Sequence, residues 1–78
     1  MGIVSDRPRL VSRIEVEARA FRNADSMTRQ LCFGHVLGLL DAGATLGLWT
    51  RRDSARISDA VYYGASPRMV RGMLRRLR

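Results

Sequence analysis

Residues 54–78 read SARISDAVYYGASPRMVRGMLRRLR, and this stretch decides the fold that we expect. Its last part, residues 67–78, has the pattern of an amphipathic helix with one apolar side and one arginine side. The apolar side consists of Met69, Val70, Met73, Leu74 and Leu77. The arginine side consists of Arg68, Arg71, Arg75, Arg76 and Arg78. Ser66 is expected to cap this helix and Pro67 to occupy its first turn, where a missing N–H costs nothing.

The preceding helix is marked by signals at both of its ends. Thr50 and Asp53 have the spacing of a capping box, with aspartate in place of the usual glutamate. The helix is expected to reach Tyr63, and Gly64 suits the left-handed conformation that often follows a helix end. Its inner face is expected to carry Ile57, Ala60 and Val61. The chain is thus expected to end in a helix, a short turn and a second helix.

A longer apolar helix is expected at residues 27–42, ending at Gly43. Apolar side chains cover a wide face of this segment, so it is predicted to be the central core helix. Gly34 and Gly38 share its other side, and their spacing predicts a close crossing with another helix. Residues 44–49 are apolar and are expected to form a short helical turn.

Residues 10–21 fit two periodicities. Apolar and charged residues alternate between Arg13 and Ala20, as they do in a half-buried strand. The same segment also contains a helical stripe, made of Leu10, Val11, Ile14, Ala18 and Phe21. We favour the helix because Pro8 and the alanines and glutamates suit one. A strand that pairs across a dimer is the alternative.

Chain length and composition limit the architecture. Seventy-eight residues support one hydrophobic core, and a hydrophobic content of 46% is that of a folded protein. We therefore expect an all-α protein with a flexible tail at 1–7 and a single domain of three or four helices at 8–78. A core of this size is only marginally stable by itself, so a homodimer is expected.

The net charge of the chain is +7, and all fourteen basic residues are arginines. Coding bias in a GC-rich genome would account for the lack of lysine, while the planar guanidinium also suits phosphate and guanine contacts. Residues 68–78 contain five arginines and no acidic residue. This imbalance predicts a polyanionic partner, with nucleic acid as the first candidate and simple solvation of the surface as the alternative.

The sequence holds no set of residues typical of an enzyme. Cys32 and His35 have the spacing of half a metal site, but no second pair exists, so a buried thiol and an ordinary histidine are expected. No glycine-rich phosphate loop is present either. We therefore expect no catalysis, no cofactor and no metal. A single cysteine forms no intrachain disulfide, and no secretory signal is recognised, which together favour the cytoplasm.

Residues 56–75 resemble the helix-turn-helix signature of bacterial and phage DNA-binding regulators. The matching positions include the small residue at the helix crossing, the turn glycine and the cap of the second helix. They also include two apolar positions that pack the second helix on the core. These positions are Ala60, Gly64, Ser66, Val70 and Met73. Asp59 departs from the signature, which has an apolar residue at that position. The resemblance implies that residues 54–78 form a helix-turn-helix-like pair.

The resemblance also implies that the second helix of the pair enters the major groove of DNA. The residues placed at or near DNA are Ser66, Pro67, Arg68, Arg71, Gly72, Arg75, Arg76 and Arg78. Arg68 or Arg71 would donate a bidentate pair to guanine, whereas the last three arginines would hold the phosphate backbone. The sequence therefore predicts a small transcriptional regulator or accessory factor that binds duplex DNA.

Two other interpretations compete with DNA binding. The apolar helix at 27–42 would suit a small phage- or plasmid-type protein that docks on an acidic host protein. Residues 31–49 are just long enough to span a bilayer. However, Asp41 near the centre of that segment is costly in lipid, and Gly43 interrupts it, so no membrane partner is expected.

Overall fold

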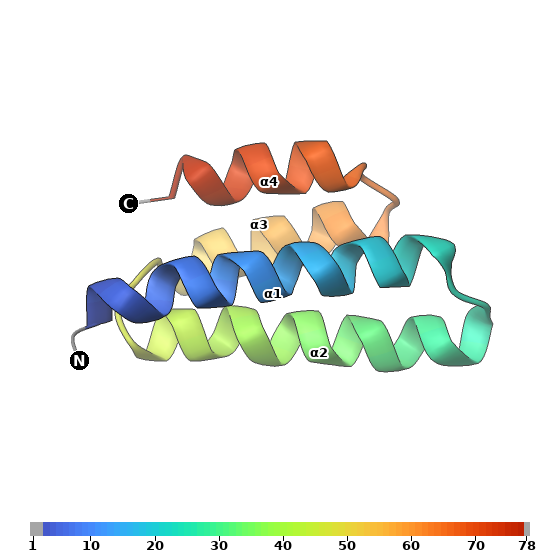
Figure 1. The fold of residues 1–78 in the computed structure, drawn as a ribbon, viewed down its shortest axis with the longest axis horizontal. Coiled ribbons are helices and arrows are strands. Elements are labelled where there is room, and N and C mark those ends of the chain that lie inside the picture. The colour runs from blue at the N-terminus through green and yellow to red at the C-terminus, as the bar shows by residue number, and fades with distance from the viewer. Residues whose placement is uncertain (1–2, 78) are drawn as a thin grey trace.

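Four helices follow one another along the chain. The computed structural model describes residues 3–77, and side chains from Arg7 onward. It contains α1 (Ile3–Asn23), α2 (Ser26–Thr45), α3 (Arg51–Tyr62) and α4 (Pro67–Arg75), and no strand within the described range. Successive helices run in opposite directions along the long axis of the molecule (Figure 1). Because α1 and α3 each pack against both α2 and α4, the helices close into a bundle. The all-α prediction is confirmed.

The core lies between the four helices and also takes in the segment that joins α2 to α3. Its buried apolar side chains are Ile14, Ala18, Phe21, Cys32, Val36, Leu40, Leu48, Trp49, Ile57, Val61, Val70 and Leu74. Burial of such side chains contributes most of the free energy that favours folding.

The helical interpretation of residues 10–21 is confirmed. Ile14, Ala18 and Phe21 are buried, and Leu10 packs against the core. A strand would place Val16 on the same side as Ile14 and Ala18, but Val16 is 55% exposed. Spacings of three and four residues between the buried positions therefore define one face of α1.

Helix α1 begins earlier than the sequence suggests. Residues 3–7, expected to be part of a flexible tail, belong to α1, and Pro8 lies inside the helix. The guanidinium of Arg7 donates to the backbone carbonyls of Leu48, at 3.2 Å, and of Leu77. These bonds tie the beginning of α1 to the α2–α3 connection and to the end of the chain. Residues 1 and 2 lie outside the described range.

Helix α2 runs past Gly43, its expected end, and reaches Thr45. Gly47, with φ 78°, takes the left-handed conformation that follows the helix end. The N–H of Leu48 then donates to the carbonyl of Gly43 at 2.9 Å, which completes a Schellman motif. The prediction that Gly43 stops the helix is therefore wrong, and residues 46–49 form a turn rather than a helix of their own.

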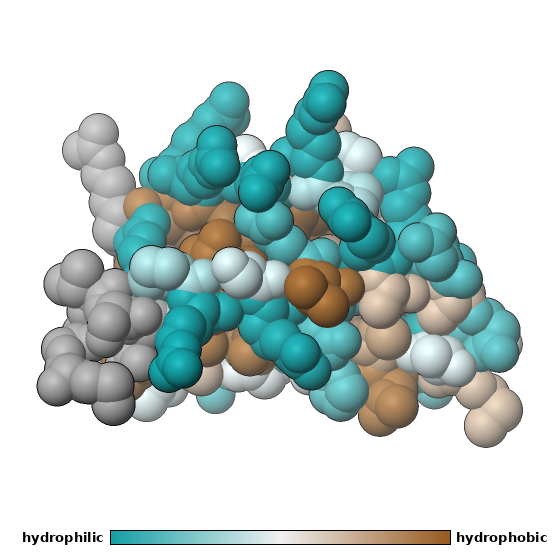
Figure 2. Space-filling model, in the orientation of Figure 1, coloured by the Kyte–Doolittle hydropathy of each residue, from teal (hydrophilic) through white to brown (hydrophobic). Residues whose placement is uncertain are grey.

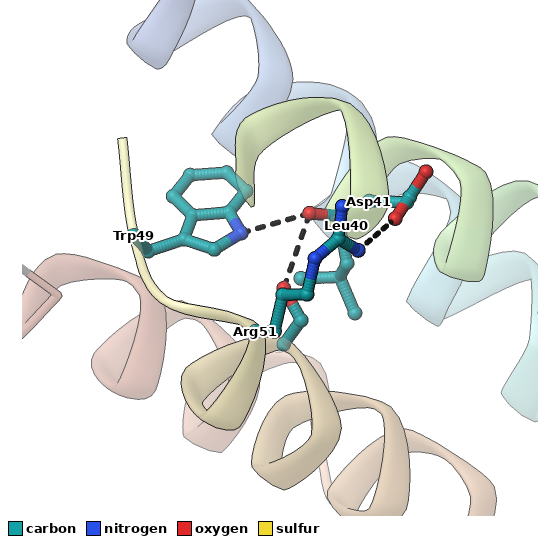
Figure 3. Close-up of polar contacts among 5 residues, drawn as sticks. Leu40, Asp41, Trp49 and Arg51 are labelled. Atoms are coloured by element: carbon teal, nitrogen blue, oxygen red, sulfur yellow. Dashed lines mark hydrogen bonds and ion pairs between the residues drawn. The ribbon is translucent and has the colours of Figure 1, made fainter. Parts of the chain in front are cut away.

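Gly43 has a packing role instead. The indole of Trp49 lies directly against it, so that a Cβ at position 43 would overlap the ring. Trp49 is 3% exposed, and its Nε1–H donates to the carbonyl of Leu40 at 2.9 Å (Figure 3). The hydroxyl of Ser54, in the first turn of α3, donates to the same carbonyl at 3.1 Å. One backbone oxygen of α2 thus fixes both the connecting segment and the next helix.

The expected beginnings of the last two helices are confirmed, and α3 ends within one residue of its expected end, whereas α4 ends at Arg75, earlier than the expected helix over residues 67–78. Thr50 and Asp53 form the capping box of α3, with hydrogen bonds of 3.0 and 3.4 Å. Gly64, with φ 86°, follows the end of α3, and the N–H of the next residue returns to the carbonyl of Ala60 at 2.9 Å. The hydroxyl of Ser66 accepts a hydrogen bond from the backbone of α4 at 3.2 Å. Local sequence therefore sets where both helices begin and where α3 ends.

Gly34 and Gly38 do not lie at a helix crossing. A Cβ built at either position would meet nothing within 4 Å, so both glycines face open space on α2. The prediction of a close helix crossing is wrong within this chain. The core side of α2 is defined by larger side chains, among them Val36 and Leu40, and it faces away from the glycines.

Candidate nucleic-acid interface

The rotation of α4 is fixed by its two fully buried side chains. Val70 and Leu74 are each 0% exposed, and they lie one turn apart on the side that faces the bundle. Arg68, Arg75 and Arg76 are consequently exposed on the other sides of the helix. Helix α4 lies along the top edge of the molecule in Figure 1. In the same orientation, hydrophilic side chains project from this edge (Figure 2).

Helix α3 adds a further arginine to this region. Arg56 and Arg76 both line a hollow of about 120 Å³ between α3 and α4, whose floor includes Ile57 and Met73. Asp53 also lines the hollow, but its carboxylate accepts from the N–H of the α3 cap. We call Arg56, Arg68, Arg75 and Arg76 the α3–α4 arginine face. Sequence reasoning missed Arg56 because it comes to line the same hollow as Arg76 only when α3 and α4 pack together.

Arg71, expected to contact DNA, turns toward α1. Its Nε lies 3.3 Å from the carboxylate of Glu15, whose side chain is 24% exposed. This pair bridges α1 and α4 and partly neutralises the arginine. An exposed ion pair of this kind contributes at most about 1 kcal/mol to stability. Arg71 is therefore less available to an external anion than the arginines of the α3–α4 arginine face.

The other residues expected to bind DNA differ from one another in exposure and in hydrogen bonding. Ser66 is half-buried, and its hydroxyl already serves as the cap of α4. A Cβ at Gly72 would meet nothing within 4 Å, so the backbone of α4 is open to close approach there. Arg78 lies outside the described residues. Of the residues expected to bind DNA, the described surface thus groups Arg68, Arg75 and Arg76 around the outer side of α4.

The direction of the helix pair differs from that of the DNA-binding motif. A helix-turn-helix joins two helices at a steep angle, whereas α4 runs back antiparallel to α3 (Figure 1). On the inner face of α3, Ile57 and Val61 are 1% and 2% exposed. Asp59, which stands where the family has an apolar residue, is exposed. Helix α3 therefore buries Ile57 and Val61 and exposes the position that is apolar in the family pattern.

Several arginines outside this face are engaged by the protein itself. Arg7 bonds to two backbone carbonyls, as described above. Arg51 forms an ion pair of 2.6 Å with Asp41 beside the α2–α3 corner (Figure 3). Among the described side chains, no acidic group pairs with any member of the α3–α4 arginine face. The charge of this face is therefore uncompensated by direct ion pairs from described residues.

The half metal site suggested by the sequence is divided between the core and the surface. Cys32 is buried, whereas His35 lies at the surface with its Nδ1 2.7 Å from Glu17 of α1. Among the side chains that the structure describes, from Arg7 to Leu77, no group of three or more histidines, cysteines or acidic residues is arranged to hold a metal ion. Across residues 3–77, no helix has both the length and the apolar character needed to cross a membrane.

Comparison of the chain with protein-family models, with curated proteins and with solved structures gave no match.

Proposed function

We propose that this protein binds duplex DNA through the α3–α4 arginine face. The observation that supports the proposal is that four exposed arginines from two adjacent helices lack ion pairs with described acidic side chains. A cluster of this kind on a protein of net charge +7 attracts a polyanion. In this proposal the protein acts as a small transcriptional regulator or accessory DNA-binding factor.

The face offers two kinds of interaction to a duplex. Arg68, in the first turn of α4, is suited to a bidentate contact with guanine, worth roughly 1–3 kcal/mol of discrimination. Arg56, Arg75 and Arg76 are suited to phosphates, which fix the register of the protein on the duplex. Because three of the four arginines are assigned to phosphates, phosphate contacts are expected to supply most of the binding free energy. Binding is therefore expected to depend steeply on salt.

The arginines of α4 are expected to differ in their contribution. Arg68→Ala removes an unpaired guanidinium, whereas Arg71→Ala removes one that is already paired with Glu15. We expect Arg68→Ala to weaken binding by about tenfold, and Arg71→Ala by much less. Fluorescence anisotropy with a labelled duplex at several salt concentrations measures both effects. Equal losses in the two variants would contradict the assignment of Arg68, and no binding by the wild type would overturn the proposal.

A second candidate function, protein docking, is favoured by the outer side of α2. Met27 and Leu31 are 84% and 62% exposed there, one turn apart. Gly34 and Gly38 continue the same side with bare backbone, which permits close approach by another helix. We propose that this surface pairs two copies of the protein, with an acidic host protein as the alternative occupant.

Sedimentation velocity distinguishes these occupants. A dimer in the wild type that becomes a monomer in Leu31→Asp would support self-association through α2. A wild type that is monomeric at all accessible concentrations would contradict it. Stoichiometric binding to an acidic protein, together with no DNA affinity at moderate salt, would favour the host-protein interpretation instead.

A further inference from the structure

A chain of four aromatic rings runs from the core to the surface at one end of the bundle. The ring centroids of Phe21 and Phe33 are 5.7 Å apart, those of Phe33 and Tyr62 are 5.4 Å apart, and those of Tyr62 and Tyr63 are 5.2 Å apart. Phe21 is buried, whereas Tyr62 and Tyr63 are 59% and 83% exposed. The inner rings therefore support two tyrosines at the surface.

Tyr63 keeps an open ring face. Its contact with Tyr62 is edge-to-face, with an interplanar angle of 89°. A contact of this kind covers at most one face of one ring, and the exposure of Tyr63 shows that little else covers it. A supported ring with an open face is a platform on which another flat π-system can stack.

Three arginines lie at the same end of the bundle as the platform, together with Asp59, which is exposed one turn before Tyr63. The ends of α1 and α3 meet the beginnings of α2 and α4 at this end of the bundle (Figure 1). Arg29 stands over the ring of Phe21, with its guanidinium carbon 5.2 Å from the ring centroid. Arg22, near the end of α1, and Arg68, at the beginning of α4, are exposed. Aromatic rings beside guanidinium groups match both parts of a nucleotide, the base and the phosphate.

We infer that Tyr63, supported by Tyr62, stacks on an unpaired nucleobase. The inference rests on the proposed DNA binding and adds a preference for DNA in which a single-stranded segment interrupts a duplex. Inside a continuous duplex both faces of each base are covered by its neighbours in the stack. Away from the duplex ends, a base at a gap or bulge presents a face that the ring of Tyr63 can cover.

The test compares a continuous duplex with a duplex of the same length and ends that carries a short internal gap. Fluorescence anisotropy gives the affinity of the wild type and of the variants Tyr63→Phe and Tyr63→Ala for each DNA. We expect the wild type and Tyr63→Phe to bind the gapped duplex about tenfold more tightly. Tyr63→Ala should bind both duplexes equally, with unchanged affinity for the continuous one. Far-UV circular dichroism should show unchanged helix content, because Tyr63 is exposed.

Several results would overturn the inference. Equal affinity of the wild type for the two duplexes would do so and would leave the proposed DNA binding intact. A loss of equal size on both duplexes in Tyr63→Ala would show an interaction that does not recognise an unpaired base. Loss of the preference in Tyr63→Phe would assign the interaction to the hydroxyl and not to the ring. No binding to either duplex would overturn the inference and the proposed function together.

Discussion

Gly43 is the residue on which the corner between α2 and α3 depends. Its position inside α2 is explained by Trp49, which packs where a side chain at position 43 would lie. Nothing near Gly43 in the sequence reveals this packing, and a glycine after an apolar helical stretch has the appearance of a helix end. The same kind of signal correctly identifies Gly64 as the residue following α3, because no side chain from elsewhere packs against it.

The packing of Trp49 predicts opposite effects of two glycine substitutions in the same helix. Gly43→Ala places a methyl group within the ring of Trp49 and should lower the free energy of unfolding by about 1–3 kcal/mol. Within one protomer Gly34→Ala meets open space, so at concentrations where the protein is monomeric it should raise the free energy of unfolding by up to about 1 kcal/mol through helix propensity. Urea denaturation monitored by circular dichroism measures both values. Similar effects of the two substitutions would contradict the packing of Trp49 on Gly43.

Asp25 caps α2 and makes the stability of this helix depend on pH. The backbone N–H of Thr28 donates to its carboxylate at 2.9 Å, which holds the pKa of Asp25 below its ordinary value of 3.8. The stabilisation is therefore fully present above pH 3.8 and is lost as the pH falls through the lowered pKa. Asp25→Asn keeps a good cap that does not titrate. The variant should show a smaller loss of thermal stability in acid than the wild type, and identical acid profiles would contradict this role.

Helix α4 is the element whose position decides the proposed function. It is nine residues long, too short to be stable in isolation. Its apolar stripe and its caps could be predicted from local sequence, because periodicity and capping act within a few residues. Its direction relative to α3 could not be predicted in this way, because it depends on contacts with residues distant in sequence, such as that of Arg71 with Glu15 of α1.

The attachment of α4 should therefore depend on its buried side chains. Leu74→Ala removes a fully buried side chain and should cost about 2–5 kcal/mol of unfolding free energy. Met69→Ala, at a 59% exposed position of the same helix, should change stability by no more than about 0.5 kcal/mol. Hydrogen exchange should show α4 opening more readily in the Leu74 variant. Equal stability of the two variants would contradict the packing of α4.

At the scale of the whole molecule, charge is distributed unevenly. The sequence correctly indicates the excess of arginine and its concentration near the end of the chain. The roles of individual arginines depend on distant partners, such as Glu15 for Arg71 and two backbone carbonyls for Arg7. Those partners become neighbours only when the bundle closes, so sequence spacing gives no sign of them.

A charge-matched comparison tests DNA binding by the α3–α4 arginine face most directly. One variant replaces three of its arginines with alanine, Arg68, Arg75 and Arg76. A second replaces Arg9, Arg13 and Arg19, which are exposed on α1, and so changes the net charge by the same amount. Duplex affinity is measured by anisotropy over a series of salt concentrations.

The first variant should lose much more affinity than the second. Its plot of log affinity against log salt should also become shallower, by about 0.9 for each phosphate that is no longer neutralised. The second variant should nearly keep the slope of the wild type. Equal losses of affinity and slope in both variants would show that only net charge matters, and would contradict DNA binding through this face.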